Sequence, residues 1–292
     1  MHLVRYRGRQ GVGVGVGSAI GVVRALPFSA FGELLHLELD ELKAAVAGAA
    51  PSSQQVRPLP PVDSRMEVWA SGVTYRRSRE ARMEESNSAD VYARVYSAER
   101  PELFFKSVPW RVVTAGDPIG VRGDSAVSVP EPELAVVANR YGQIIGYTVC
   151  NDVSSRSIEG ANPLYLPQAK VYAGSCALAP GVRPIWEVDD AQNLTITCVI
   201  TRGISVVWQA ETNTSQMHRA PGELVDWLFR HNTFPDGVVL STGTGLAPDL
   251  DVTLQEGDVV SIDIDDVGTL SNVVRVGVDS FRFLEECDDE GV

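Results

Sequence analysis

The sequence predicts a β-rich α+β fold, made of a small N-terminal α/β domain and a larger β-rich domain. Short segments rich in β-branched and aromatic residues recur from residue 68 onward, with Gly, Pro, Asn or Asp between them. Only one later segment, 220–230, has a clear helical pattern. The chain has 292 residues, of which 44% are hydrophobic and 22% charged, and this composition is sufficient for a substantial core.

The N-terminal segment combines short strands with one helix. Residues 2–26 alternate apolar residues with polar residues or glycine, which predicts strands joined by hairpins. The glycines match neither GxGxxG nor GxxxxGK followed by Ser or Thr, because Ser18 takes the place of a third glycine, so we do not expect a nucleotide site. Residues 31–48 have the apolar spacing of an amphipathic helix, which can break near His36.

A proline-rich segment, 49–63, follows this helix and marks the domain boundary. We therefore assign residues 1–60 to the N-terminal domain and residues 61–292 to the larger domain. In the larger domain, Pro221 suits the first turn of the helix expected at 220–230. The strands expected there are 103–105, 127–129, 134–137, 144–149, 194–201, 238–240 and 259–264.

Composition and charge exclude several classes of protein. The net charge of −13 and the lack of a concentrated basic patch argue against a nucleic-acid partner. No apolar run is long enough for a membrane helix or a signal peptide, so we expect a cytoplasmic protein without a membrane partner. The four cysteines form no CxxC pair and the four histidines are scattered, so we expect neither a disulfide framework, nor a zinc site, nor histidine catalysis.

Two glutamates provide the first indication of chemistry. In an extended segment Glu131 and Glu133 point to the same side, and two like charges so close together need a cation. Carboxylate oxygens are ligands that Mg²⁺ and Ca²⁺ prefer. On this motif alone, a solvated acidic turn remains an alternative.

A hairpin adds a third carboxylate. The turn at 139–142 and the strand at 144–149 return the chain, so that Asp152 comes close to the two glutamates. Three carboxylates leave about half of an octahedral shell open to water and a bidentate substrate. Further on, Lys170 lies among aliphatic residues, where a lysine can lose hydration and act as a base or stabilise an enolate. A lone lysine is, however, usually on the surface.

Five motifs together resemble the fumarylacetoacetate hydrolase superfamily. They are PELFFK, EPEL, GYTVCNDVSSR, the downstream lysine and STGTG, in the usual order, and the resemblance covers approximately residues 66–276. It implies a mixed β-roll behind a small N-terminal domain, and a homodimer or homotetramer. It also implies Mg²⁺, with Mn²⁺ or Ca²⁺ as substitutes, and a 2-oxo acid substrate. The site residues implied are Glu131, Glu133 and Asp152 as metal ligands, Lys170 as the active-site lysine, and Lys106, Arg156, Thr244 and Tyr75 as substrate contacts.

One departure from the family pattern narrows the reaction. Hydrolases and decarboxylases of the superfamily have a histidine shortly after a lid motif, but the stretch 72–78 contains none, and none occurs between His36 and His218. Carbon–carbon hydrolysis therefore loses support. The stretches GVTYRRSREARMEES, DVYARVYSAERPELFFKS and EGANPLYLPQAKVYAGSCAL resemble instead the branch of 2-keto-3-deoxy-pentonate dehydratases, which act in pentose catabolism.

This resemblance implies a Mg²⁺-dependent hydro-lyase that converts 2-dehydro-3-deoxy-D-arabinonate to 2,5-dioxopentanoate. Chelation of the 2-oxo acid acidifies its C3 protons. Lys170 is then the expected base at C3, and a lid carboxylate, Glu84 more than Glu85, is the expected acid for the C4 hydroxyl. The alternative for these lid residues is pairing with the arginines around them.

Two other functions compete with this one. The first is a Mg²⁺-dependent acylpyruvate hydrolase or oxo-acid decarboxylase, which would need a base other than the missing histidine. The second is a catalytically silent metal-binding or scaffold protein. The intact carboxylates, Lys170 and Thr244 argue against the silent protein.

Overall fold

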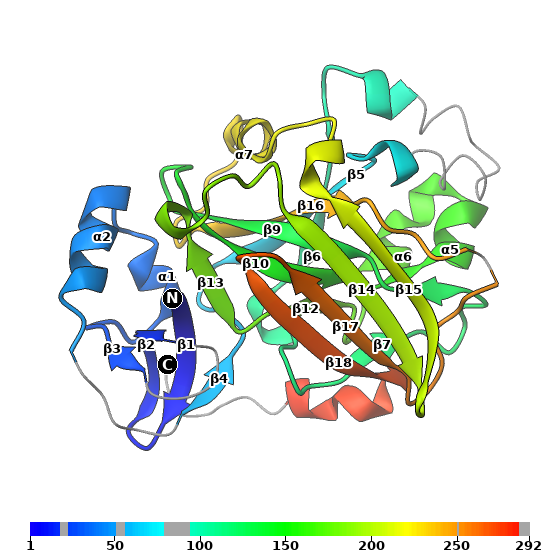
Figure 1. Cartoon of the computed structure of the whole chain (residues 1–292), viewed down its shortest axis with the longest axis horizontal. Coiled ribbons are helices and arrows are strands. Elements are labelled where there is room, and N and C mark those ends of the chain that lie inside the picture. Colours follow the sequence, from blue (N-terminus) through cyan, green and yellow to red (C-terminus); the bar gives the residue numbers. More distant parts are fainter. Residues whose placement is uncertain (18–22, 51–55, 79–93, 250, 286–292) are drawn as a thin grey trace.

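The computed structural model describes residues 1–17, 23–50, 56–78, 94–249 and 251–285. Within these ranges the largest element is an 11-stranded mixed sheet (Figure 1). Across this sheet the strands follow the order β3 (Arg24–Ala25), β2 (Gly11–Gly17), β1 (His2–Gly8), β13 (Gly181–Pro184), β10 (Ile144–Asp152), β9 (Pro132–Ala138), β16 (Val238–Thr244), β5 (Glu67–Gly72) and β6 (Glu102–Ser107), with β12 (Cys176–Leu178) on β10 and β4 (Arg57–Leu59) on β1.

A second sheet packs across β9 and β10 and closes the roll (Figure 1). In order, its strands are β15 (Ser205–Asn213), β14 (Thr195–Arg202), β17 (Val259–Ile264), β18 (Gly268–Val276) and β7 (Ile119–Val121). A short ladder joins β11 (Ser154–Ser155) to β8 (Ser128–Val129). The β-rich α+β fold that we expected is thus confirmed.

The helices in the described part of the chain are short. The segment 31–48 forms two helices that are separated around His36, where we expected a break. The helix expected at 220–230 is also present, and no described helix combines the length and hydropathy needed to cross a membrane. Helices within the described ranges include α1 (Phe31–Leu34), α2 (Leu39–Ala47), α5 (Arg156–Ala161), α6 (Leu166–Lys170) and α7 (Pro221–Phe229), with 3₁₀ turns at Pro109–Arg111, Pro163–Tyr165, Ile185–Glu187, Thr214–Gln216 and Asp279–Leu284.

Strand β9 is buried on both of its faces. Leu134 and Val136 point into the core shared with the second sheet, whereas Ala135 and Val137 point into the core shared with the N-terminal segment. This explains why the sequence of β9 is an unbroken apolar run, which is typical of a strand covered on both sides. Polar side chains at its beginning are therefore held in a rigid, water-poor environment.

The N-terminal segment extends the large sheet. Strand β1 pairs with β13, where Leu3 lies opposite Val182, and the two regions share one hydrophobic core. Part of the proline-rich segment differs from the expected linker, because β4 pairs with β1 and Pro58 lies opposite Tyr6. Proline is tolerated on an outer strand such as β4, where its missing N–H breaks no ladder. The domain division at residue 60 stays a prediction.

Packing explains the glycine-rich sequence of β2. A Cβ atom at Gly13 would lie 3.0 Å from the Tyr6 hydroxyl oxygen, and a Cβ atom at Gly15 would lie 2.1 Å from a methyl carbon of Val23. These glycines leave room for neighbouring side chains within the paired strands.

Asp236 ties together three segments at the start of two parallel strands. Its carboxylate accepts hydrogen bonds from the backbone N–H of Arg65 at 3.1 Å and from the Arg65 guanidinium at 3.0 Å, and it lies 2.9 Å from His36 Nε2. The hydrogen bonds from Arg65 lower the pKa of Asp236. Because Val238 of β16 lies opposite Glu67 of β5, this contact fixes the beginning of both strands.

Asp236→Asn should destabilise the protein by about 1–3 kcal/mol, because charge-assisted hydrogen bonds to a buried carboxylate are lost. Chemical denaturation measures this free energy of unfolding. The matched control is Asp249→Asn, which changes a carboxylate that is 81% exposed and pairs with Arg77. An exposed pair contributes at most about 1 kcal/mol. Equal losses for both variants would contradict the role given to Asp236.

Candidate active site

The β9–β10 hairpin brings three carboxylates together. Its turn is formed by Asn139, whose side-chain oxygen accepts the backbone N–H groups of Tyr141 and Gln143 at 3.0 and 2.9 Å. From this turn β9 and β10 run side by side, and the N–H of Asp152 donates to the carbonyl of Glu131 at 3.0 Å. One carboxylate oxygen from each member of the triad lies within 4.8 Å of the others, and all three side chains are buried. The triad is Glu131, Glu133 and Asp152.

Strand β16 holds Glu133 from the side opposite β10. Its Oε2 accepts hydrogen bonds from Ser241 Oγ at 2.6 Å and from the backbone N–H of Gly243 at 2.7 Å. Gly243 is required there, since its φ is +91° and a Cβ atom would lie 2.0 Å from Thr74 Oγ1.

Burial and two neighbouring carboxylates raise the pKa of Glu133 well above its usual value. A divalent cation would offset this repulsion, and three oxygen ligands suit Mg²⁺. The triad therefore fits a hard metal ion.

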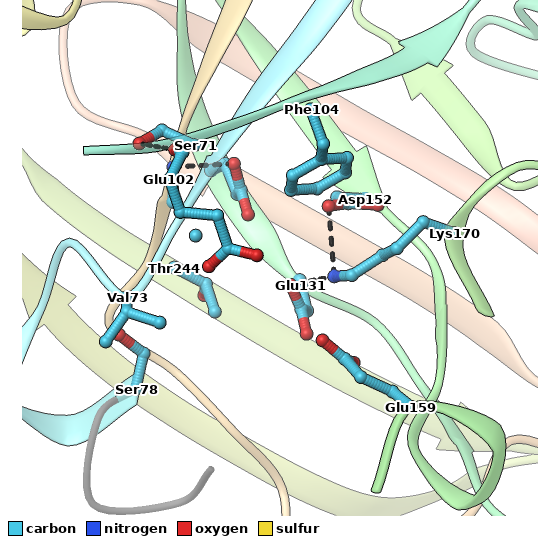
Figure 2. Close-up of a pocket in the computed structure, with 13 residues that line it drawn as sticks. Ser71, Val73, Ser78, Glu102, Phe104, Glu131, Asp152, Glu159, Lys170 and Thr244 are labelled. Carbon is cyan, nitrogen blue, oxygen red and sulfur yellow. Dashed lines mark hydrogen bonds and ion pairs between the residues drawn. The ribbon is translucent and has the colours of Figure 1, made fainter. Parts of the chain in front are cut away.

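Lys170 lies against the same carboxylates (Figure 2). From the end of α6, its Nζ donates to Glu131 Oε2 at 2.7 Å, to Asp152 Oδ2 at 3.1 Å and to Ser154 Oγ at 2.6 Å. Its side chain is buried, and Nζ is 5.7 Å from the centre of the Phe104 ring. Lys170 is thus an interior lysine beside the candidate metal-binding carboxylates, not a surface residue.

Two further cations contact the carboxylates. Lys106 Nζ lies 2.5 Å from Asp152 Oδ1 and also donates to the backbone carbonyls of Val153 and Lys170. Arg156 Nη2 lies 3.1 Å from Glu131 Oε1. Both side chains are buried, and neither is among the described residues that border the pocket. In this structure they contact metal-ligand candidates, and direct substrate contact by either stays a prediction.

A pocket opens over the triad and Lys170 (Figure 2). Its wall includes Glu102 of β6 and Glu159 of α5, which the sequence analysis did not single out. Gly72 makes room for the first of these, because a Cβ atom there would lie 2.2 Å from Glu102 Oε2. The sequence contained an indication of Glu102. Side chains alternate along a strand, so Glu102, Phe104 and Lys106 of the PELFFK motif point to one face of β6. The pocket therefore has two carboxyl groups beyond the candidate metal-binding triad, Glu102 and Glu159, and Figure 2 shows that both point inward.

Of the other site residues expected from the sequence, one borders the pocket, one does not, and one lies outside the described residues. Thr244 borders the pocket, but its hydroxyl group bonds to the carbonyl of Pro132 at 2.9 Å and to the N–H of Leu246 at 3.1 Å. Tyr75 is buried away from the pocket wall, and burial together with the charge of Glu133 raises its pKa. Glu84, like its alternative Glu85, lies outside the described residues. The roles expected for these residues stay predictions.

A family comparison identifies the larger part of the chain. Residues 67–275 match the model for the C-terminal region of fumarylacetoacetate hydrolase. The chain belongs to the fumarylacetoacetate hydrolase family. This confirms the resemblance found in the sequence and explains the mixed β-roll.

Comparisons with individual proteins give more specific similarities than the family model. The chain is 55% identical over 214 residues to a probable 2-keto-3-deoxyxylonate dehydratase of Haloferax volcanii, with 73% of each chain covered. It is 44% identical over 225 residues to the 2-dehydro-3-deoxy-D-arabinonate dehydratase of Saccharolobus solfataricus, with 75% of each covered. A solved structure of 2-keto-3-deoxy-D-arabinonate dehydratase, complexed with magnesium and 2,5-dioxopentanoate, superposes with a TM-score of 0.79 at 34% identity, over 95% of this chain and 99% of that one.

Mg²⁺ should stabilise the protein more strongly as the pH rises. The raised pKa of Glu133 favours its protonated form without a cation, and Mg²⁺ must displace that proton. The contribution of Glu133 to stability without Mg²⁺ is therefore present at low pH and lost as the pH rises through its raised pKa. Over this range the apparent Mg²⁺ affinity should increase by up to about tenfold per pH unit.

Melting temperatures with and without millimolar Mg²⁺, between about pH 5.5 and about pH 8, measure this effect. Glu133→Gln is the matched control, because it keeps the side-chain shape without the titrating group, and it should lose most of the stabilisation. A gain in melting temperature that is independent of pH, or that persists in Glu133→Gln, would count against the site.

Proposed function

We propose that the enzyme is a Mg²⁺-dependent dehydratase that converts 2-dehydro-3-deoxy-D-arabinonate, a 2-keto-3-deoxy-pentonate, to 2,5-dioxopentanoate. The observation that carries this proposal is the pocket in which the buried amine of Lys170 and the carboxyl group of Glu102 lie beside three metal-binding carboxylates. The names of the relatives that are 55% and 44% identical support the same reaction.

The triad of Glu131, Glu133 and Asp152 would hold the cation. When bound, Mg²⁺ polarises the ketone of a bidentate 2-oxo acid and stabilises the negative charge that develops as C3 loses a proton. The buried side chains around the triad keep the substrate's carboxylate and ketone end away from bulk water, which strengthens these electrostatic interactions.

Lys170 is the base for the C3 proton in this proposal. Its Nζ is on the pocket wall and within hydrogen-bond distance of two of the metal-binding carboxylates, so a 2-oxo acid held by those groups would place C3 near the amine. This step requires the neutral amine of Lys170, whose lone pair takes the proton as the C3–H bond breaks. The short helix α6 and the packing around it hold this nitrogen in place.

Glu102 is the proposed acid for the leaving hydroxyl. A protonated carboxyl group donates its proton as the C4–O bond breaks, so that water leaves rather than hydroxide. Glu102 is a described carboxyl group on the pocket wall that is not part of the triad, whereas the lid residue Glu84 lies outside the described residues. Proton transfer from C5 to C3 then gives an enol, and its tautomerisation yields the C5 aldehyde of 2,5-dioxopentanoate.

The histidines favour dehydration over hydrolysis. None of the four is among the described residues that border the pocket, and His218 instead stacks on Tyr96 with ring centres 4.6 Å apart. The described residues that border the pocket therefore include no histidine that could act as a base and activate water for attack on carbon. A place in pentose catabolism and a homodimeric or homotetrameric assembly, which rest on the family resemblance, complete the proposal, together with a cytoplasmic location, which rests on the pattern of the sequence.

The purified enzyme should remove one water molecule from a 2-keto-3-deoxy-pentonate in the presence of Mg²⁺, and a chelator should abolish this activity. Mass spectrometry of the products from a panel of 2-keto-3-deoxy sugar acids measures the reaction. Acylpyruvates in the same panel test the hydrolase alternative. Faster release of pyruvate from an acylpyruvate than of water from any sugar acid would show that the dehydratase assignment is wrong.

Glu102→Gln and Lys170→Met should affect different steps. The glutamine variant should slow dehydration by about 10²–10⁴-fold, the usual contribution of a general acid, but keep exchange of C3 protons with D₂O. The methionine variant should lose both dehydration and exchange of the C3 protons. Proton NMR of 2-oxobutanoate, which has C3 protons but no leaving group, measures the exchange alone. Equal loss of exchange in both variants would contradict the division of roles.

A further inference from the structure

Ser154 makes the shortest hydrogen bond to the amino group of Lys170. Its Oγ is 2.6 Å from Nζ, compared with 2.7 Å for Glu131 Oε2 and 3.1 Å for Asp152 Oδ2. Ser154 is fully buried in β11, two residues after Asp152, so the two side chains share one face of the extended segment. The serine is therefore a built part of the lysine's surroundings.

The single hydroxyl hydrogen of Ser154 already has a partner. Ser154 Oγ donates it to the backbone carbonyl of Asp152 at 2.9 Å. A serine hydroxyl group has one hydrogen and two acceptor lone pairs. The contact with Lys170 must then use an N–H of the lysine as donor and a lone pair of Ser154 as acceptor.

We propose that Ser154 is the positioning residue that orients the amino group of Lys170 for proton transfer at C3. Because the hydroxyl hydrogen of Ser154 is directed to the carbonyl of Asp152, the lysine presents an N–H to Ser154. This short contact fixes the position of Nζ beside Glu131 and Asp152, where the proposed 2-oxo acid would be held. This inference rests on the proposed function and adds to it the group that aims the base.

The other contacts of Lys170 make Ser154 the suitable group for this role. Glu131 and Asp152 are candidate metal ligands, so their oxygens would contact both the cation and Lys170. Ser154 is neutral and is not one of the candidate metal ligands. The backbone carbonyl of Lys170 is held separately, by Ser175 Oγ at 2.9 Å and by Lys106 Nζ. The base is thus fixed at its backbone by one set of groups and at its tip by Ser154.

Ser154→Ala tests the proposal. We expect kcat for dehydration to fall by about 10²-fold, the typical cost of misplacing a catalytic group by about 1 Å. KM and the Mg²⁺ dependence should change by less than about twofold, because neither the triad nor the pocket wall is altered. Exchange of the C3 protons of 2-oxobutanoate should fall in parallel with kcat, since both depend on the same nitrogen.

Ser155→Ala is the matched control. Ser155 is equally buried, but its Oγ contacts Ser125 Oγ at 2.7 Å and accepts from the N–H of Ile158 at 3.4 Å, at the beginning of α5. This variant should lose stability, by about 1 kcal/mol as is typical for a helix cap, and keep the wild-type kcat. An effect on kcat equal to that of Ser154→Ala would show that any loss of a buried serine has this consequence, and would overturn the proposal.

Two more variants separate orientation from packing. Ser154→Thr keeps the hydroxyl group and should recover most of the kcat and exchange lost in Ser154→Ala. Ser154→Cys keeps the volume but offers a weak acceptor, so it should resemble the alanine variant, and it carries the test if the alanine variant fails to fold. Wild-type kcat and exchange in a folded Ser154→Ala or Ser154→Cys would overturn the proposal.

The experiment distinguishes this inference from the proposed function. If the wild-type protein removes no water from any 2-keto-3-deoxy acid, the proposed function fails. The 2-oxobutanoate exchange still decides the role of Ser154 in that case: loss of exchange in Ser154→Ala supports orientation of the lysine, and unchanged exchange overturns it.

Discussion

The structure depends on the burial of three carboxylates within 4.8 Å of one another. Bringing like charges so close in a water-poor interior is costly unless cations or hydrogen-bond donors offset the repulsion. Lys106, Arg156 and Lys170 supply positive charge, and Ser241 with the backbone N–H of Gly243 supplies neutral donors to Glu133. The surrounding strands and short helices are arranged so that these groups reach the carboxylates, and a divalent cation would complete the compensation.

Local rules predicted the three-carboxylate part of the site. The period of two in a strand placed Glu131 and Glu133 on one side, and the hairpin placed Asp152 opposite them, as the register of β9 and β10 bears out. These inferences succeed because a hairpin with a clear turn specifies its own pairing. They need no knowledge of distant segments.

The remaining site residues depend on tertiary packing that periodicity does not reveal. Lys170 reaches the triad through α5 and α6, helices of six and five residues, which are too short for an apolar pattern to be recognised. Glu102 reaches the pocket because β6 pairs with β5, a strand that the sequence analysis did not identify. The strands of the N-terminal segment join the large sheet, a pairing that the sequence pattern does not reveal, because free strand edges can pair whatever their distance in sequence.

A crystal structure of the protein with Mg²⁺ and 2,5-dioxopentanoate would show whether the three carboxylates and Lys170 form one active site. We expect one cation at roughly 2.0–2.1 Å from an oxygen of each of Glu131, Glu133 and Asp152. We also expect the product's carboxylate and ketone to face this cation, with Lys170 Nζ on the side of C3 and the Glu102 carboxyl group near C4. A cation held by other residues, or a product whose C3 lies away from Lys170, would contradict this arrangement.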